Sequence, residues 1–272
     1  MSPPRVLAFD SGFGGLTVFQ PLVAARPDID IVYLADDSAF PYGRLSDAAL
    51  VARVGDVIGA AIHQFAPDLV LIACNTATTL ALAPLRRAHP SLPFVGAVPA
   101  IKPAAAASRT RRISVLATLA TVQRDYTRQL IADHAGDCAV DLIGAPNLAP
   151  QAERHIRGLA VDRDLVARDL LPAFVDVGGR RTDMIVLACT HFPLLLDVLS
   201  ACAPWPVTFV DPGAAIARRA NSLLPASLAG AHGARTLALT SDAPVEGALA
   251  ARLAAFGLAG GPIRLRVPVA TA

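Results

Sequence analysis

Two cysteines occupy matching places in two similar stretches of the sequence. Cys74 follows an apolar run at residues 69–73, and Cys189 follows an apolar run at residues 184–188. Short, continuous apolar runs of this kind are typical of buried strands in a parallel sheet. Because open α/β sheets bind ligands at the carboxyl ends of their strands, both thiols are candidates for a ligand site.

The neighbours of these two thiols suggest proton transfer. A helix is expected to begin directly after each cysteine, and a helix N-terminus favours the thiolate over the thiol. Free cysteines are more often small buried apolar residues than catalysts, and we keep that interpretation for Cys138 and Cys202. His191 is either an acid–base residue beside Cys189 or a core histidine with satisfied hydrogen bonds. The adjoining side chains that suit a small polar ligand are Asn75, Thr76, Thr190 and His191.

A glycine-rich turn from Asp10 to Gly15 joins a strand-like run to a helix-like run. It contains part of a dinucleotide-binding fingerprint, and Asp36 closes the next strand, where a ribose-binding acid would lie. Two features argue against a dinucleotide, because Thr17 occupies the third glycine position and Asp10 would face the pyrophosphate charge. We therefore expect the turn to bind a small carboxylate or ammonium group through its N–H groups, the Ser11 hydroxyl and Asp10.

Three further features have an ordinary structural interpretation when each is taken alone. Phe40-Pro41-Tyr42-Gly43 has the composition of a turn. Glu153 has the setting of a solvent-exposed helix residue. Cys189 and His191 are both metal-binding residue types, but no third and fourth ligand stands at a useful spacing, so no metal is expected.

The elements that would position these residues alternate between β-rich apolar runs and runs with helical spacing. The clearest helix begins at Ser46, a good N-cap, and places Leu50, Val54, Ile58 and Phe65 on one face. This alternation predicts an α/β fold with mostly parallel sheets and right-handed crossovers. The expected strands are residues 5–9, 31–35, 69–73, 93–97, 113–117, 139–143, 184–188, 207–210, 235–239 and 263–269.

The same alternation has the spacing of two copies of one α/β unit. Cys74 comes 64 residues after Asp10, which follows the first strand-like run of the chain. Cys189 comes 71 residues after Thr118, which follows the strand-like run at residues 113–117. The spacings predict that each copy presents one thiol at the same point of its sheet.

Composition excludes several classes of protein. The 272 residues are 54% hydrophobic and carry a formal charge of +2 with no basic block, so we expect no nucleic acid partner. The longest uncharged run, residues 69–85, contains polar residues and a proline, so no membrane span is expected. No signal-peptide layout and no CxxC pair occur, which predicts a cytoplasmic protein. The apolar content is compatible with a monomer or a homodimer. Pyridoxal phosphate chemistry would have to use Lys102, the only lysine.

Five blocks of the sequence carry a family resemblance. They are Phe9-Asp-Ser-Gly-Phe-Gly-Gly-Leu-Thr-Val18, Asp36 with Phe40-Pro-Tyr-Gly43, Cys74-Asn-Thr-Ala77, Val98-Pro-Ala-Ile-Lys-Pro103 and Cys189-Thr-His-Phe-Pro-Leu-Leu195. In residue type and order they resemble the signature blocks of the glutamate racemases, and they cover most of residues 5–215. The first and last blocks distinguish that family from the aspartate and hydantoin racemases, which share its two cysteines.

The resemblance implies two pseudosymmetric, three-layer α/β domains with mostly parallel sheets and an active site in the cleft between them. The N-terminal domain would comprise residues 1–98 and 209–272, and the second domain residues 99–208. By matching position, the implied catalytic residues are Cys74, Cys189, Asp10, His191 and Glu153. The implied substrate-binding residues are Asp10, Ser11, Tyr42, Gly43, Asn75, Thr76, Thr190 and His191.

The expected reaction is the interconversion of L- and D-glutamate without a cofactor, which would supply D-glutamate for peptidoglycan. Two groups of equal chemistry on opposite faces of the α-carbon can remove and return a proton reversibly. Two alternatives stay open: a racemase of another amino acid such as aspartate, and an amino-acid-binding module without turnover.

Overall fold

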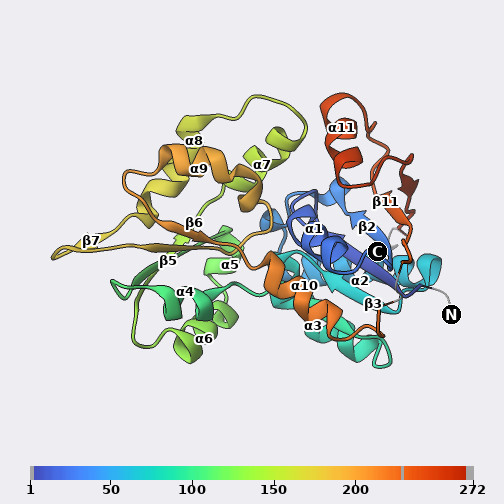
Figure 1. The fold of residues 1–272 in the computed structure, drawn as a ribbon, viewed down its shortest axis with the longest axis horizontal. Helices are drawn as coiled ribbons and strands as arrows, with labels where there is room; N and C mark the ends of the chain where they lie inside the picture. The colour runs from blue at the N-terminus through green and yellow to red at the C-terminus, as the bar shows by residue number, and fades with distance from the viewer. Residues whose placement is uncertain (1–2, 228–229, 268–272) are drawn as a thin grey trace. The chain divides into compact units, whose positions relative to one another are not determined.

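The computed structural model of the chain describes residues 3–227 and 230–267. The chain forms two units, one from Met1–Ala97 with Gly213–Ala272 and the other from the continuous segment Val98–Pro212. In each unit, helices cover a parallel sheet (Figure 1), which confirms the predicted α/β class. The expected boundary at which the chain returns to the first unit was residue 209. The return lies a few residues later, at Gly213, because residues 208–210 still pair with a strand of the second unit.

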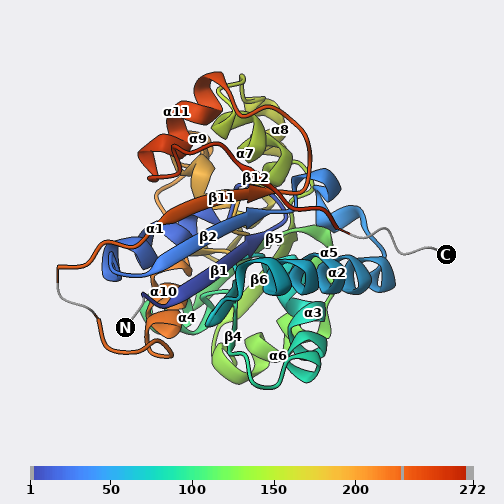
Figure 2. The ribbon, with the colours of Figure 1, turned by 90° about the vertical axis from the view of Figure 1, so that its right-hand side faces the viewer.

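As far as its residues are described, the first unit contains a six-stranded parallel sheet in the order β12–β11–β2–β1–β3–β4, of which β11, β2 and β1 lie side by side in Figure 2. Phe9 of β1 lies beside Leu34 of β2 on one side and Ile72 of β3 on the other. The strand order therefore reverses at β1, and open α/β sheets bind ligands at such a reversal. The strands are β1 (Arg5–Asp10), β2 (Asp30–Ala35), β3 (Leu69–Ile72), β4 (Phe94–Gly96), β11 (Arg235–Leu239) and β12 (Ile263–Arg264).

The six strands begin within a residue of the expected positions, but β12 is shorter than predicted. Residues 265–267 follow it without strand pairing, and residues 268–269 of the expected strand lie outside the described residues. The predicted buried strands are confirmed, because every residue of β3 and every residue of β1 after Arg5 is buried. Such burial is expected of strands that helices cover on both faces.

The helices of the first unit lie on both faces of its sheet. Because β1 leads to β2 on one side and β2 leads back to β3 on the other, right-handed crossovers place the two connecting helices on opposite faces (Figure 2). One face carries α1 (Leu16–Ala25) with α10 (Gly213–Asn221), and the other carries α2 (Asp47–Phe65) with α3 (Asn75–Ala88). The remaining elements are η1 (Asp37–Ala39), η2 (Tyr42–Arg44) and α11 (Gly247–Ala255).

Helix α2 forms as predicted from its N-cap and its apolar face. The Ser46 hydroxyl accepts a hydrogen bond from the Ala49 N–H at 3.3 Å, which satisfies one of the unpaired donors of the first turn. Leu50, Val54 and Ile58 are fully buried against the sheet and α3. Within the described part of the chain, α2 is the one helix long and apolar enough to cross a membrane by length and composition alone.

The second unit, over its described residues, contains a four-stranded parallel sheet in the order β10–β9–β5–β6 and a separate exposed hairpin. The four strands match the expected apolar runs. The hairpin was not predicted, because each of its strands has two residues and no alternating pattern. The strands are β5 (Arg112–Ala117), β6 (Ala139–Gly144), β9 (Met184–Leu187) and β10 (Thr208–Val210), with β7 (Asp176–Val177) and β8 (Arg180–Arg181) in the hairpin.

The two sheets share one strand order, which supports the predicted duplication. In the first unit the order is β2–β1–β3–β4, and in the second it is β6–β5–β9–β10. Cys74 follows β3, which pairs with β1, and Cys189 follows β9, which pairs with β5 in the same way. The helices of the second unit are α4 (Ile101–Ala107), α5 (Leu119–Val122), α6 (Asp125–His134), α7 (Leu148–Ile156), α8 (Arg163–Leu170), η3 (Leu171–Ala173), η4 (Phe192–Leu195) and α9 (Leu196–Cys202).

Candidate active site

The first thiol site is the group Asp10, Ser11, Cys74 and Asn75 at the carboxyl ends of β1 and β3. Asp10 is fully buried at the end of β1, and Cys74 is the N-cap residue of α3. The Cys74 Sγ lies 3.8 Å from the Ser11 Oγ, and the Ser11 hydroxyl donates to the Asp10 Oδ1 at 3.2 Å. A hydroxyl therefore connects the thiol to a carboxylate, and the N–H dipoles of α3 face a thiolate at this position.

The glycine-rich turn can pass this site because Gly15 has no side chain. A Cβ added there would lie 2.9 Å from the Asp10 Cβ and 3.0 Å from the Ala73 Cβ, closer than carbon atoms pack. The Tyr33 hydroxyl donates to the Gly12 carbonyl at 2.8 Å and fixes the other part of the turn. The turn therefore brings its backbone next to Asp10 and to Ala73, the residue before Cys74.

Among the described residues, only the nitrogen of the Asn75 side-chain amide has a hydrogen-bond partner. Its side chain is 2% exposed, and its Nδ2 donates to the Ala97 carbonyl at 3.5 Å. The Asn75 Oδ1 is buried and accepts no hydrogen bond from any residue that the structure describes. Because an unsatisfied buried acceptor is costly, this oxygen is suited to a ligand that carries a donor such as an ammonium group. Thr76 is also buried, on the same first turn of α3.

The turn at Phe40–Gly43 brings Tyr42 to the first thiol site. Tyr42 is 2% exposed, packs in one buried cluster with Phe9 and Cys74, and lies in η2 beside Gly43. Burial raises the pKa of Tyr42 well above its usual value, and the charges of Asp36 and of Cys74 add to this rise. The shared buried cluster therefore places the phenol in the surroundings of the thiol.

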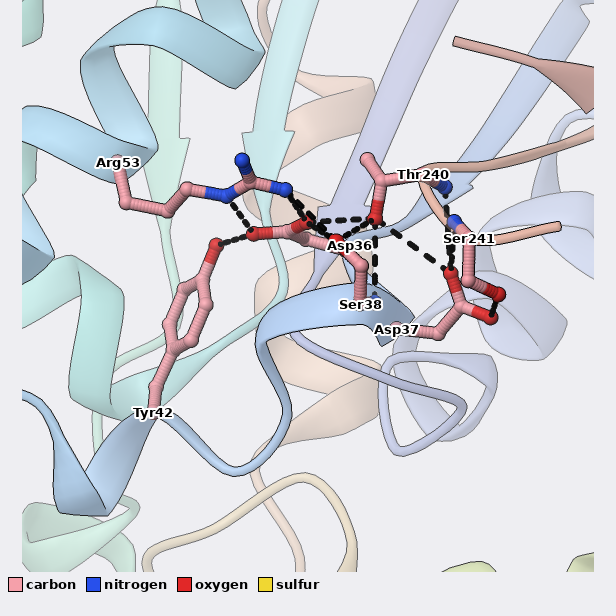
Figure 3. A network of polar contacts seen from close by, with 7 residues as sticks. All are labelled: Asp36, Asp37, Ser38, Tyr42, Arg53, Thr240 and Ser241. Carbon is pink, nitrogen blue, oxygen red and sulfur yellow. Dashed lines mark hydrogen bonds and ion pairs between the residues drawn. The ribbon is translucent and has the colours of Figure 1, made fainter. Parts of the chain in front are cut away.

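Asp36, the residue considered for a ribose, has other partners. Its carboxylate accepts hydrogen bonds from Arg53, Tyr42 and Thr240, so it is fully engaged within the protein (Figure 3). This arrangement gives no support to the dinucleotide interpretation of the glycine-rich turn. Arg53 and Thr240 were not identified from the sequence as neighbours of the site.

The second thiol site is the group Cys189, His191 and Glu153. All three side chains are buried, with exposed fractions of 7%, 2% and 7%. The Cys189 Sγ lies 4.0 Å from the His191 Nδ1, and the His191 Nε2 lies 3.0 Å from the Glu153 Oε1. A carboxylate on one ring nitrogen orients the imidazole and directs its other nitrogen toward the thiol. The interpretation of Glu153 as a solvent-exposed residue is wrong, because α7 turns it toward His191.

Glu153 has a second charged neighbour, and the start of its helix is capped. Its second oxygen lies 3.4 Å from the Arg157 Nη2, one helical turn away. Asp169 of α8 accepts hydrogen bonds from the backbone N–H groups of Asn147 and Leu148, at 2.6 and 3.2 Å, and so caps the start of α7. The sequence pattern around Asp169 contains no sign of this cap, because its partners lie 21 and 22 residues away.

The other candidates fall into two groups. Thr190 is buried between Cys189 and His191. Cys138 and Cys202 are partly exposed, and the Cys138 Sγ lies 3.8 Å from the Asp137 Oδ1. Among the described residues, no group of three or more His, Cys, Asp or Glu side chains is arranged to hold a metal ion.

Chemically, each unit presents one buried thiol with a group that can accept or orient a proton. At the first thiol site this group is the Ser11 hydroxyl with Asp10, and at the second it is His191 with Glu153. Burial strengthens these interactions, because hydrogen bonds and charges act more strongly away from water. Each site, taken by itself, is suited to acid–base chemistry on a small polar molecule.

Comparisons with known proteins agree with this chemistry. Residues 22–220 match the Asp/Glu/Hydantoin racemase family. The chain is 52% identical over 227 residues to the glutamate racemase of Brucella ovis, which covers 83% of this chain and 82% of the relative. It is also 52% identical over 219 residues to the glutamate racemase of Brucella anthropi, covering 80% and 79% of the two chains.

Solved structures are similar over almost the whole chain. Escherichia coli glutamate racemase in complex with L-glutamate and the activator UDP-MurNAc-Ala is 37% identical, with a TM-score of 0.88 over 98% of this chain and 100% of that chain. Thermus thermophilus glutamate racemase in complex with β-chloro-D-alanine is 27% identical, with a TM-score of 0.74 over 99% of each chain. With its duplicated α/β units and a buried thiol in each, the chain belongs to the Asp/Glu/Hydantoin racemase family.

Proposed function

We propose that this protein is a glutamate racemase, an isomerase that interconverts L- and D-glutamate without a cofactor and supplies D-glutamate for peptidoglycan. The observation that carries the proposal is the duplicated thiol: each unit ends the corresponding strand with a buried cysteine that has a hydrogen-bonding partner. One thiol would serve as base and the other as acid. Because both groups are thiols, the reverse reaction uses the same pair with exchanged roles.

In one direction the Cys74 thiolate removes the α-hydrogen of glutamate as a proton, and the Cys189 thiol delivers a proton to the opposite face. The electron pair of the broken C–H bond remains on the substrate until the new C–H bond forms, so no oxidant or reductant is needed. After the reaction Cys74 is a thiol and Cys189 a thiolate, which is the starting state for the other enantiomer. Asp10 assists at the first thiol, and His191 with Glu153 assists at the second.

The α-hydrogen of an amino acid is weakly acidic, so the site must stabilise the carbanion that develops. Hydrogen-bond donors aimed at the α-carboxylate act most strongly where water is excluded. Buried residues provide such groups beside each thiol, and the Asn75 Oδ1 is suited to the substrate ammonium group. The proposed substrate contacts are Asp10, Ser11, Tyr42, Gly43, Asn75, Thr76, Thr190 and His191.

The direct test is to incubate the purified protein with L-glutamate, without added cofactor, and to follow optical rotation. One arm should contain UDP-MurNAc-Ala, because the E. coli relative was crystallised with it as an activator. Loss of rotation in either arm supports the proposal, and no change in both arms contradicts it. L-Aspartate in a parallel arm tests the alternative substrate. Binding of glutamate without turnover would instead favour an amino-acid-binding module.

A cytoplasmic location and a homodimer remain proposals for this chain. Fractionation of cells that express the tagged protein tests the location, and light scattering across a range of protein concentrations tests the dimer. A constant monomer mass at every concentration would contradict the dimer.

A further inference from the structure

Asp36 is the centre of a buried hydrogen-bond network beside the first thiol site (Figure 3). The side chain lies at the end of β2 with 0% exposure. Its Oδ2 accepts from the Tyr42 hydroxyl at 2.5 Å and from the Arg53 Nε at 2.8 Å. Its Oδ1 accepts from the Arg53 Nη2 at 2.5 Å and from the Thr240 hydroxyl at 2.6 Å. We call Asp36, Tyr42, Arg53 and Thr240 the Asp36 network.

The charges of the network fix the direction of its hydrogen bonds. Burial alone would raise the pKa of Asp36, but hydrogen bonds from Arg53, Thr240 and Tyr42 and the charge of Arg53 lower it below its usual value. The same contact with Asp36 raises the pKa of Arg53. At neutral pH the carboxyl is therefore ionised, and Tyr42, whose pKa is raised, keeps its proton and donates a hydrogen bond to Asp36.

A second carboxylate fixes the position of Thr240. Asp37 accepts hydrogen bonds from the backbone N–H groups of Thr240 and Ser241 at 3.2 and 2.9 Å, and from the Ser241 hydroxyl. The segment that follows β11 is thereby joined to η1, more than 200 residues earlier in the chain. The Thr240 hydroxyl is held in the direction of Asp36 rather than free to rotate away (Figure 3).

The network adjoins the reacting thiol through Tyr42 and through the backbone. Tyr42 packs in one buried cluster with Cys74 and Phe9. The Asp36 N–H donates to the Asp10 carbonyl at 2.8 Å, so the network is also joined to the end of β1. Arg53 and Thr240 both donate hydrogen bonds to Asp36, which also accepts one from Tyr42.

We propose that Arg53 and Thr240 are positioning residues for the racemase reaction, which hold the Tyr42–Gly43 turn beside Cys74 through the Asp36 carboxylate. The inference rests on the proposed function. Arg53 supplies a two-point contact, and a guanidinium fork restricts a carboxylate more than a single hydrogen bond does. Without these donors the turn loses its anchor, and small displacements of a substrate-positioning group are costly to catalysis.

Activity measurements distinguish a positioning role of Arg53 and Thr240 from a role in the general stability of the fold. Arg53→Gln and Thr240→Val should each raise the KM for glutamate by about tenfold while kcat falls less, because a loosened substrate-binding turn weakens ground-state binding. Thr240→Ser keeps the hydroxyl and should restore the wild-type KM. Arg26→Gln is the matched control, since Arg26 forms a buried two-point contact with Asp28 in the same unit, at 2.8 and 2.9 Å. It should lower the melting temperature without changing KM.

A double-mutant cycle tests whether Arg53 acts through the Tyr42 hydroxyl. Tyr42→Phe removes the hydroxyl but keeps the ring, and Arg53→Gln added to it should cause little further loss. Interacting residues show such non-additivity, whereas independent residues add. Additive effects, or wild-type KM values in both Arg53→Gln and Thr240→Val, would overturn the proposal.

A readout independent of turnover keeps the two proposals separate. The rates at which iodoacetamide alkylates Cys74 and Cys189 can be followed peptide by peptide with mass spectrometry. Arg53→Gln should change the rate at Cys74 severalfold and leave Cys189 unchanged, and Arg26→Gln should change neither. If the wild type fails to racemise glutamate, the proposed function fails while this pattern still decides the positioning role. An unchanged alkylation rate of Cys74 in Arg53→Gln would contradict the positioning role of Arg53.

Discussion

The two thiols have different partners although they occupy the same point of two similar sheets. Cys74 lies next to a hydroxyl that donates to a carboxylate, whereas Cys189 lies next to an imidazole that contacts a carboxylate. The duplicated fold therefore provides symmetric positions but unequal surroundings. We expect the two directions of the reaction to depend on different assisting residues.

The thiols themselves are the first prediction. Cys74→Ser and Cys189→Ser should each lower racemisation by about 10²–10⁴-fold, the range that a positioned acid–base group contributes. A serine hydroxyl fits the space but does not ionise at neutral pH as a thiol does. Polarimetry with purified variants measures the effect, and Cys138→Ser and Cys202→Ser are the matched controls. Near wild-type activity in Cys74→Ser would refute the two-thiol mechanism.

The assisting residues give a second prediction. Asp10→Asn and His191→Asn should slow the two directions unequally, with opposite bias, because each residue serves a different thiol. The ratio of kcat/KM values stays fixed, since L- and D-glutamate have equal free energy, so the bias must appear in kcat and KM separately. Initial rates from each enantiomer measure it. The same bias in both variants would contradict the assignment.

Solvent exchange checks the same arrangement in the wild type. In D₂O the product should gain deuterium while the remaining substrate gains little at early times, because the acid that protonates the product differs from the base that deprotonated the substrate. Proton NMR of each enantiomer measures the exchange. Rapid exchange into unreacted substrate would indicate a single base that works from one side.

At the scale of the elements, the site depends on how closely the glycine-rich turn approaches β1 and β3. Gly15→Ala should lower the free energy of unfolding by about 1–3 kcal/mol, the usual cost of forcing extra atoms into a packed region. It should also reduce activity, because the clash falls on Asp10. Urea denaturation measures the stability.

A glycine elsewhere in the first unit is the control for this effect. Gly55 lies in α2 with nothing within 4 Å of an added Cβ, so Gly55→Ala should stabilise the protein by about 0.5–1 kcal/mol. Equal effects of the two substitutions would show that backbone freedom, rather than the contact with Asp10, explains the result at Gly15.

The Asp36 network joins β2, η2, α2 and the segment after β11. Its contribution to the free energy of unfolding depends on pH, because the network is centred on an ionisable carboxyl group. The pKa of Asp36 is lower in the folded protein than the value of about 3.9 expected in the unfolded chain. Its ionised form therefore stabilises the fold fully above the unfolded pKa, and this stabilisation is lost as pH falls through the folded pKa. Denaturation of wild type and Asp36→Asn should differ most above about pH 4 and converge at lower pH. A constant difference would contradict the network.

At the scale of the whole molecule, the two units differ in how the chain builds them. The second unit is the continuous segment Val98–Pro212, and its four-stranded sheet uses strands of that segment alone. The first unit needs both ends of the chain, because β11 pairs with β2 from beyond residue 212. Completion of the first sheet therefore waits for the last part of the chain.

This difference predicts how fragments behave. Residues 98–212 expressed alone should unfold cooperatively on heating, as followed by circular dichroism. Residues 1–97 alone should aggregate, because the edge of β2 is left unpaired without β11. Joining residues 1–97 to residues 213–267 should restore cooperative unfolding. A soluble, cooperative fragment of residues 1–97 would contradict the role of β11.

The sequence by itself determined the features that depend on neighbouring residues. Apolar runs predicted the strands, and the N-cap at Ser46 predicted the start of α2. The same local patterns placed Cys74 and Cys189 at strand ends. Burial and backbone conformation over a few residues are decided by side-chain type and spacing, which can be read directly from the chain.

Only the tertiary structure decided which distant side chains meet. The contact of His191 with Glu153 spans 38 residues, and that of Asp36 with Thr240 spans 204. No local pattern encodes such pairs, because they depend on strand order and on which face each helix covers. Glu153 has the sequence setting of a solvent-exposed residue until α7 packs against η4 and turns it toward His191. The positions of the thiols are local properties of the chain, whereas their surroundings arise from the packing of segments far apart in it.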